Sequence, residues 1–415
     1  MRVSEIASQI RVRISAAAIK AEDYVSTDNM RSNFGGIDTS SSLPPSGSVT
    51  AYQEGDILLS NIRPYFRKTW LATHSGGCNA DVLCIRANPN KCFSKYLYYL
   101  FTTDNFVNDY LKSCKGAKMP RGDVQRLLNY EVDLPDLPTQ LRIAGVLGSL
   151  DEKIALNRTK IAELEALAKT IYDYWFVQFD FPDKNGNPYK SSGGKMVWNE
   201  QLKCEVPEGW EVTQIGKHIK SNRGVSYSTK NISSGEGIPM INLNSFNVTS
   251  TYKVAGIKTF EGEIPDYKLL KPFDLVMCNT QQTDLDPNKD IIGKSFLVPD
   301  IFNSNITSSH HVTTIHVDDN ELKVFLNALF HTKEFHAYIS GFASGTSIRG
   351  LDFFGVESCH VALPPKPLLS KFSQLVMACE KQKSIVLRNQ SLLQPLRDYL
   401  LPLLMNGQVT VGGLK

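Results

Sequence analysis

Apolar residues occur along this chain in short runs that are rich in β-branched side chains and bounded by polar or turn-forming residues. Such runs are typical of buried strands. We predict strands at Ile57–Leu59, Val82–Ile85, Leu275–Cys278 and Val312–Val317. Two longer segments, Tyr96–Tyr110 and Leu322–Tyr338, instead place their apolar residues at helical spacing, and each predicts an amphipathic helix.

The second half of the chain repeats the first at a constant offset. YLYYLFTTDNF (Tyr96–Phe106) aligns with FLNALFHTKEF (Phe325–Phe335), and the same offset aligns Leu134-Pro135 with Leu363-Pro364. Upstream the match loosens but keeps its order: GDILLSN aligns with FDLVMCN at a different offset, so that Asn61 corresponds to Asn279. The pattern therefore predicts one unit used twice, a mixed α/β domain followed by a long helix.

Each predicted long helix follows a proline-rich segment and carries apolar residues at alternating steps of three and four, which is a heptad pattern. The first seam consists of Ile154, Asn157, Ile161, Leu164, Ala168, Ile171 and Trp175, and the second of Ile385, Asn389, Leu392, Leu396, Tyr399 and Leu403. Two such helices in one chain most simply bury their seams against each other. The alternative is that each helix packs on its own domain.

Composition narrows the class of protein. The chain has 415 residues, of which 42% are hydrophobic and 21% charged, as expected for a globular protein of two or three domains. No apolar run approaches the roughly 18–20 residues of a membrane span, and the N-terminal segment lacks the apolar core of a signal peptide. The 8 cysteines are scattered without Cys-x-x-Cys spacing, which favours free thiols over zinc ligands. We therefore expect a cytoplasmic protein.

The segment NGNPYKSSGGK (Asn185–Lys195) resembles a phosphate-binding loop and a methyltransferase catalytic loop, but it lacks residues that each of them requires. A phosphate-binding loop would require glycine at the position of Tyr189 and a hydroxyl at that of Met196. As a methyltransferase loop, the Asn-Pro-Tyr triplet lacks an acidic or second-proline context, and no glycine-rich strand–helix turn is present to hold S-adenosylmethionine. The density of Gly, Asn, Pro and Ser predicts a connector.

The histidines do not suggest a metal site. His310 and His316 share a strand face but lie roughly 20 Å apart at about 3.3 Å per residue, and the matching strand of the first copy has no histidine. His331 and His336 are spaced off a common helical face. We expect no metal, no cofactor and no catalytic residue in this chain.

Two loops in each copy carry residue types that suit contacts with nucleic acid. Cations and aromatic rings suit phosphate and base-edge contacts, arginine can bind guanine through two hydrogen bonds, and amide side chains suit adenine edges. In the first copy the candidates are Arg63, Tyr65, Arg67, Lys68, Lys115, Lys118 and Arg121. In the second they are Arg223, Asn279, Gln281, Gln282, Ser344, Thr346 and Arg349. Solvated loops are the alternative, and the net charge of +3 is low for a protein that binds nucleic acid unaided.

Several segments together resemble the specificity (S, or HsdS) subunit of type I restriction–modification systems. These are YVSTDNM (Tyr24–Met30), the long block Leu134–Phe176, FPDKNGNPYKSSGGKMVWNEQLKCEVPEGWEV (Phe181–Val212) and the closing LRDYLLPLLMNGQV (Leu396–Val409). The resemblance covers essentially the whole chain.

The resemblance implies a mixed α/β protein with two target recognition domains, each reading half of a split double-stranded DNA site. It implies that the long helices form an antiparallel coiled coil, which fixes the distance between the halves and docks two adenine-methylating modification subunits. Restriction subunits, an ATP-dependent endonuclease and translocase, complete such a complex. The helix residues expected to serve these contacts are Ile154, Ile161, Leu164, Ile171, Leu392, Leu396 and Leu403.

The expected boundaries are 1–137 for the first recognition domain, 138–178 for the first helix, 179–206 for a connector, 207–365 for the second domain, 366–406 for the second helix and 407–415 for a tail. Two other functions stay open at this point. One is a DNA adenine methyltransferase fused to a recognition domain, and the other is a coiled-coil scaffold that binds no DNA.

Overall fold

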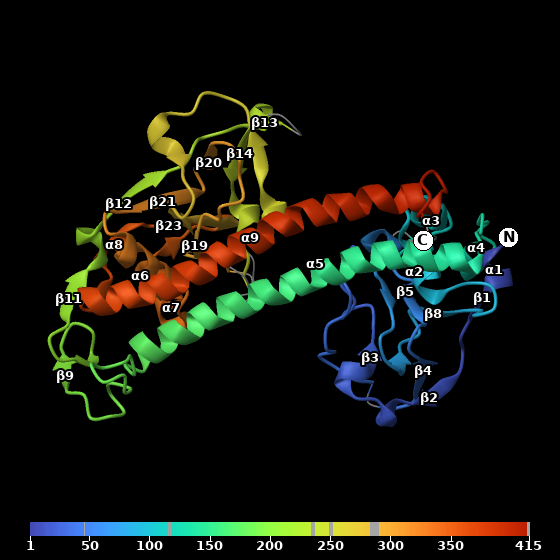
Figure 1. Cartoon of the computed structure of the whole chain (residues 1–415), viewed down its shortest axis with the longest axis horizontal. Coiled ribbons are helices and arrows are strands. Elements are labelled where there is room, and N and C mark those ends of the chain that lie inside the picture. Colours follow the sequence, from blue (N-terminus) through green and yellow to red (C-terminus); the bar gives the residue numbers. More distant parts are fainter. Residues whose placement is uncertain are drawn as a thin grey trace. The chain divides into compact units, whose positions relative to one another are not determined.

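The computed structural model describes residues 1–44, 46–114, 116, 118–233, 237–248, 252–282 and 290–412 (Figure 1). The chain folds into two compact units. The first combines Met1–Ile154 with Leu393–Lys415, and the second is Ala155–Leu392. Each long helix contributes to both units, because the division falls within α5 and within α9.

The first unit is built on an antiparallel sheet with the strand order β1-β8-β5-β6, drawn in blue in Figure 1. These strands are β1 (Ala7–Gln9), β8 (Val82–Ala87), β5 (Ile57–Ser60) and β6 (Thr69–Leu71). A second sheet, ordered β2-β4-β7-β3, consists of β2 (Arg13–Ser15), β4 (Ser48–Tyr52), β7 (Gly76–Cys78) and β3 (Tyr24–Val25). The helices are α1 (Val3–Ile6), α2 (Ser94–Thr102), α3 (Asp104–Leu111) and α4 (Val124–Leu128).

The second unit repeats the main sheet, with the order β12-β21-β17-β19. These strands are β12 (Ile219–Arg223), β21 (Val312–Val317), β17 (Leu275–Cys278) and β19 (Ser295–Leu297), and the covering helices are α6 (Asn320–Phe330), α7 (Lys333–Ser340) and α8 (Phe354–Ser358). Another sheet has the order β13-β15-β14-β20-β16, formed by β13 (Ile232–Ser233), β15 (Lys258–Phe260), β14 (Ile238–Ile241), β20 (Ile306–Ser308) and β16 (Leu269–Leu270). The remaining pairs are β9 (Met196–Asn199) with β10 (Cys204–Pro207) and β11 (Glu211–Gln214) with β24 (His360–Leu363).

Both faces of the central strand are buried in each unit. Ile57 and Leu59 of β5 enter the core under the helices, whereas Leu58 enters the core on the opposite face. In β17, Leu275 and Val276 divide between two cores in the same way. This alternation follows from the two-residue period of a strand and explains why these segments appear as continuous apolar runs in the sequence. The four predicted strands are confirmed.

The two predicted amphipathic helices are each broken into two. The break falls at Thr103 in the first unit and at Thr332 in the second, where the backbone is extended. Each threonine hydroxyl accepts a hydrogen bond from a backbone N–H three residues later, that of Phe106 or Phe335. A threonine N-cap therefore starts a new helix at the same place in both copies.

The long helices pack antiparallel in each unit. α5 spans Leu137–Tyr172 and continues into a π-helical turn, Asp173–Val177, while α9 spans Lys366–Met405. In the second unit the Tyr172 ring lies 6.0 Å from that of Phe372. In the first unit Leu147 shares one core with Leu401.

The seam predicted on the second helix is wrong. Leu392 and Leu396 are 68% and 45% exposed, and Leu403 is half-buried. The buried face of α9 instead contains Lys383, Leu387, Leu401 and Leu404, with Arg397 largely covered. The apolar heptad was assigned to the wrong face because charged residues occupy two of the inward positions. On α5, Ile154 is buried, and Ile161, Leu164 and Ile171 are partly buried, as predicted.

The connector is ordered by its own polar residues and aromatic rings. The Asp183 carboxylate accepts hydrogen bonds from the backbone N–H groups of Asn185 and Asn187 at 2.8 Å. The Tyr189 ring stacks on Phe181, with centroids 4.7 Å apart. The Asn-Pro-Tyr triplet thus closes a turn. Among the described residues, no helix combines the length and apolar character needed to cross a membrane.

Candidate nucleic-acid interface

In the first unit, two loops that are distant in sequence lie side by side where strand β5 ends. Ile62 forms an antiparallel bridge with Arg121. The Arg63 N–H donates to the Pro120 carbonyl at 2.8 Å, and the Gly122 N–H donates to that of Asn61 at 3.1 Å. The structure therefore joins the two loops that the sequence marked as candidates.

The second unit builds the same junction after β17. Strand β18 (Thr280–Gln282) pairs with β23 (Ile348–Leu351), which also pairs with β22 (Ala343–Ser344). The Leu351 N–H donates to the Asn279 carbonyl at 2.8 Å, as Gly122 does to Asn61 in the first unit. The duplicated sheet thus presents two adjoining loops at the same strand end in both units.

The first loop presents two aromatic rings on a strained turn. Pro64–Phe66 form a 3-10 turn between Arg63 and Arg67, whose φ angles of 47° and 52° are left-handed. Non-glycine residues adopt this conformation at a cost of about 1–3 kcal/mol, so the surroundings must hold it. The backbone N–H groups of Asn33 and Phe34 do so by donating to the carbonyls of Phe66 and Arg67, both at 2.9 Å.

Tyr65 and Phe66 at the tip of this turn are 49% and 40% exposed. Their rings lie 4.7 Å apart. A pair of exposed rings on a rigid backbone suits stacking on nucleic-acid bases.

The cations of the first unit have different surroundings. Lys118 is exposed, and the Arg121 side chain is 59% exposed and lies 2.9 Å from Asp81. Arg67 is bound to Asp104 at 2.6 Å, and the Lys68 ammonium donates to the backbone carbonyl of Thr27. Lys118 and Arg121 are therefore the more accessible of these cations, whereas Arg67 and Lys68 brace the loop.

The other two candidates of the first unit are Arg63 and Lys115. The Arg63 Nε is buried and has no hydrogen-bond partner within the described part of the chain. Lys115 lies outside the described residues.

The candidates of the second unit are only partly accessible. Asn279 is 1% exposed, and its amide donates to the Thr313 hydroxyl at 2.8 Å. Its assignment as a DNA contact is therefore wrong, because its amide holds the strand end in place. The Gln281 side chain accepts a hydrogen bond from the Ile291 N–H. The Gln282 side chain lies outside the described residues.

The remaining candidates of the second unit lie nearer the surface. Ser344 and Thr346 are exposed, as is Arg223 at the end of β12. Arg349 is partly buried and lies 3.6 Å from the Asp290 carboxylate.

Known proteins resemble this chain in sequence and in fold. A family model described as the type I restriction modification DNA specificity domain matches residues 23–166. The MjaIX specificity subunit of Methanocaldococcus jannaschii is 26% identical over 379 residues, covering 88% of this chain and 80% of the relative. The HindI specificity subunit of Haemophilus influenzae is 22% identical, covering 88% and 89%. The crystal structure of a type I S subunit from M. genitalium has a TM-score of 0.61 at 12% identity, covering 100% of this chain and 96% of that one.

The chain is thus similar, over 88% of its length, to specificity subunits of type I restriction–modification systems. A specificity subunit is the DNA-recognition component of such a system, and the catalytic steps belong to other subunits. The solved structure supports the fold, which is two mixed α/β domains with two long antiparallel helices.

The second junction also contains a pair of histidines, which the sequence analysis considered only as metal ligands. The rings of His310 and His311 lie 3.8 Å apart, and His311 Nδ1 is 2.7 Å from the Thr280 hydroxyl. Burial, with His310 and Arg223 nearby, lowers the pKa of His311. Their position directly before β21, opposite the candidate loop, was the signal that could have identified them. Among the described residues, no group of three or more His, Cys, Asp or Glu side chains is arranged to hold a metal.

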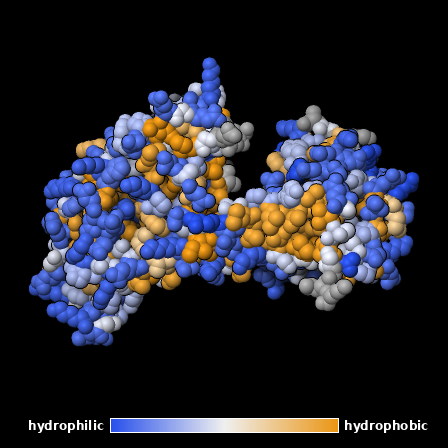
Figure 2. All heavy atoms as spheres, turned by 45° about the horizontal axis from the view of Figure 1, so that its top comes forward, coloured by the Kyte–Doolittle hydropathy of each residue, from blue (hydrophilic) through white to orange (hydrophobic). Residues whose placement is uncertain are grey.

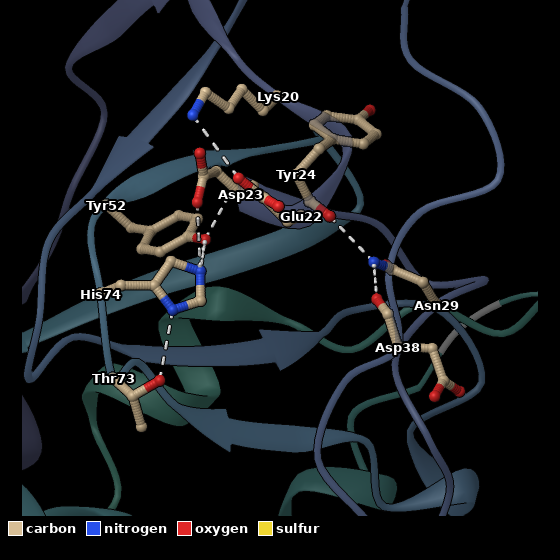
Figure 3. Close-up of polar contacts among 9 residues, drawn as sticks. All are labelled: Lys20, Glu22, Asp23, Tyr24, Asn29, Asp38, Tyr52, Thr73 and His74. Atoms are coloured by element: carbon tan, nitrogen blue, oxygen red, sulfur yellow. Dashed lines mark hydrogen bonds and ion pairs between the residues drawn. The ribbon is translucent and has the colours of Figure 1, made fainter.

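A polar cluster of the first unit supports the loop that carries Asn33 (Figure 3). The Asn29 side chain, 8% exposed, donates to the Asp38 carbonyl at 2.7 Å. His74 lies 3.7 Å from Asp23 and 3.4 Å from the Tyr52 hydroxyl, as Figure 3 shows. Asn29 belongs to the YVSTDNM segment, which the sequence marked only as a family signature. The structure gives that segment a bracing role beside the aromatic turn.

Proposed function

We propose that each globular unit of this specificity subunit reads one half of a bipartite double-stranded DNA site. The observation that carries this proposal is the repeated junction with unlike side chains. After β5 the loops offer aromatic rings and exposed cations; the second junction offers hydroxyls and Arg349 in its loops and two histidines directly before β21. A common frame with different chemistry suits two different base sequences.

The long helices, in this proposal, set the spacer and dock two modification subunits. Leu392 and Leu396 are exposed on α9, and Figure 2 shows orange, hydrophobic spheres gathered over the long helices. Exposed apolar patches of this kind favour protein contacts. The adenine methylation is performed by the modification subunits, and restriction subunits add the ATP-dependent endonuclease and translocase. The complex acts in the cytoplasm, and this chain needs no cofactor of its own.

The spacing role has a simple physical scale. At about 1.5 Å per residue, the helical segment Asp151–Val177 spans about 40 Å, close to the ~34–36 Å of one turn of B-DNA. Inserting one heptad after Leu164, with a second after Lys383 on the facing helix, should lengthen the recognised spacer by about three base pairs. Mapping of methylated sites in a host that expresses the complete complex would measure the change, and an unchanged spacer would refute the ruler.

Domain exchange tests the half-site assignment. Replacing residues 1–135 with the first domain of another specificity subunit should change one half of the methylated sequence and leave the other half intact. The intact subunit, expressed with the same partners, is the control. A change in both halves, or in neither, would contradict the proposal.

A further inference from the structure

Within the described residues, an ion pair joins α5 to α9 in each compact unit. In the second unit the Lys383 ammonium lies 3.6 Å from the Glu165 carboxylate, and the lysine side chain is 5% exposed. In the first unit the Arg397 guanidinium lies 3.7 Å from Asp151, and its side chain is 13% exposed. A cation so removed from water is costly unless it is paired, and Arg397 also has a second acid, Asp398 of its own helix, at 2.9 Å.

Both pairs have further polar partners close by. Glu380 lies 2.8 Å from Lys383 on the same helix. Burial lowers the pKa of Lys383, but Glu380 and Glu165 outweigh it, so the net shift is upward and the lysine stays charged. In the first unit the Asp151 carboxylate also accepts the Tyr99 hydroxyl at 2.7 Å.

The two pairs share one antiparallel register. From Asp151 to Glu165 the chain advances fourteen residues along α5, and from Lys383 to Arg397 it advances fourteen along α9. Fourteen residues are two heptads, so both acids occupy the same heptad position of α5 and both cations the same position of α9. The α5 residues at this heptad position are Leu137, Ala144, Asp151, Arg158, Glu165 and Tyr172.

Neighbouring heptad registers are disfavoured by the same residues. A slip of one heptad in one direction places Lys383 opposite Arg158 and Arg397 opposite Ala144. A slip in the other direction places Lys383 opposite Tyr172 and Arg397 opposite Arg158. Each slip breaks both ion pairs and brings one buried cation against Arg158. The native register is therefore favoured by attraction and protected by repulsion.

We infer that Glu165–Lys383 and Asp151–Arg397 are positioning pairs that hold α9 to one heptad register on α5 and so restrict the protein to one DNA spacer length. The inference rests on the proposed function, in which the helices set the spacer. One heptad advances a helix by about 10 Å, which corresponds to about three base pairs of B-DNA. The registers that the pairs exclude thus correspond to sites with spacers about three base pairs longer or shorter.

Replacing the ionic groups with apolar side chains tests this inference. The variant carries Glu165→Met, Glu380→Met, Lys383→Met, Asp151→Asn and Arg397→Met. Apolar replacement of a buried ion network is commonly neutral for stability, so the complex should keep its melting temperature within a few degrees. It is assembled with its modification subunits and offered DNA in which the native half-sites are separated by a series of spacers. Methylation at spacers about three base pairs from the native length should rise at least tenfold relative to the unaltered complex.

Two variants control for charge and packing. Lys381→Met removes an exposed cation from the adjoining turn of α9, and it should leave spacer selectivity unchanged. Lys383→Arg keeps the buried charge and should also retain the native spacer. If the apolar variant folds poorly, Glu165→Gln and Lys383→Gln combined with Asp151→Asn and Arg397→Gln remove both pairs with polar side chains retained.

The outcomes separate this inference from the proposed function. Apolar or Gln variants that methylate the native spacer alone overturn the register role. An unaltered complex that methylates all spacers equally, or that keeps its spacer after heptads are inserted in both helices, refutes the ruler itself.

Discussion

Lys118 and Arg121 offer a quantitative test of the first recognition junction. Both belong to the loop that lies against the aromatic turn, and both are exposed. The perturbation is Lys118→Ala and Arg121→Ala, separately and together, in the specificity subunit assembled with its modification subunits. Neither side chain contributes to a core, so the variants should fold.

The magnitude follows from counterion release. Each phosphate contact contributes about 0.9 to the slope of log affinity against log salt, which at 0.1 M salt is about eightfold in affinity. Lys118→Ala should therefore weaken binding about eightfold. Arg121 must first leave Asp81, and an exposed pair of this kind is worth about 0–1 kcal/mol, so its removal should cost only about 1.5- to 8-fold.

Binding is measured by fluorescence anisotropy on a labelled duplex between 50 and 200 mM salt. The double variant should lower the salt slope by about 1.8. Lys91→Ala is the matched control. This exposed lysine follows β8, which runs antiparallel to β5, so it lies at the opposite end of the sheet from Asn61. An unchanged slope in the double variant, or an equal loss in the control, would refute the assignment of these cations to phosphate.

Three further outcomes are expected. Tyr65→Ala with Phe66→Ala should weaken binding by about 1–3 kcal/mol per stacked base, and only through the first half-site, in competition assays with duplexes altered in one half. Asp56→Asn removes a carboxylate that is 1% exposed and accepts two hydrogen bonds from the Arg86 guanidinium. It should lower the free energy of unfolding in urea by about 2–3 kcal/mol. Asp274→Asn at the equivalent turn of the second unit should lower it by less. Burial lowers the pKa of His331 to about 4, whereas the same imidazole in the unfolded chain takes up a proton once the pH falls below about 6.5. The free energy of unfolding should therefore drop by up to about 2 kcal/mol between pH 7 and pH 5. His331→Gln should remove that pH dependence.

The sequence identified the elements whose burial is simple. Strands such as Ile57–Ser60 are apolar on both faces and stand out in any pattern analysis. The helix breaks were missed because Thr103 and Thr332 interrupt otherwise continuous apolar periodicity, and only their hydroxyl caps reveal the change. The second helix seam was placed on the wrong face because a buried lysine is invisible to a search for apolar heptads.

The sequence alone could not predict which of the candidate site residues are accessible. Residue type and loop position located both junctions, but accessibility depends on partners that are distant in sequence. Asn279 has suitable chemistry for adenine, yet Thr313 and the His310 carbonyl occupy its amide. Conversely, Asn33 and Phe34 hold the aromatic turn through backbone groups, which carry no sequence signal.

The fold also explains how one scaffold can serve two DNA targets. In β5 and β17 successive side chains enter cores on opposite faces, so no residue of either strand can change without altering packing. The next residue, Asn61 or Asn279, receives the second loop on its backbone carbonyl, and its side chain bonds to Tyr110 or Thr313. Beyond that point one copy closes a strained 3-10 turn and the other extends a small sheet, while the hydrogen bonds at the junction stay the same. Recognition can therefore diverge without a change of fold, because the point of divergence lies beyond both cores and beyond the asparagine that fixes the junction in each unit.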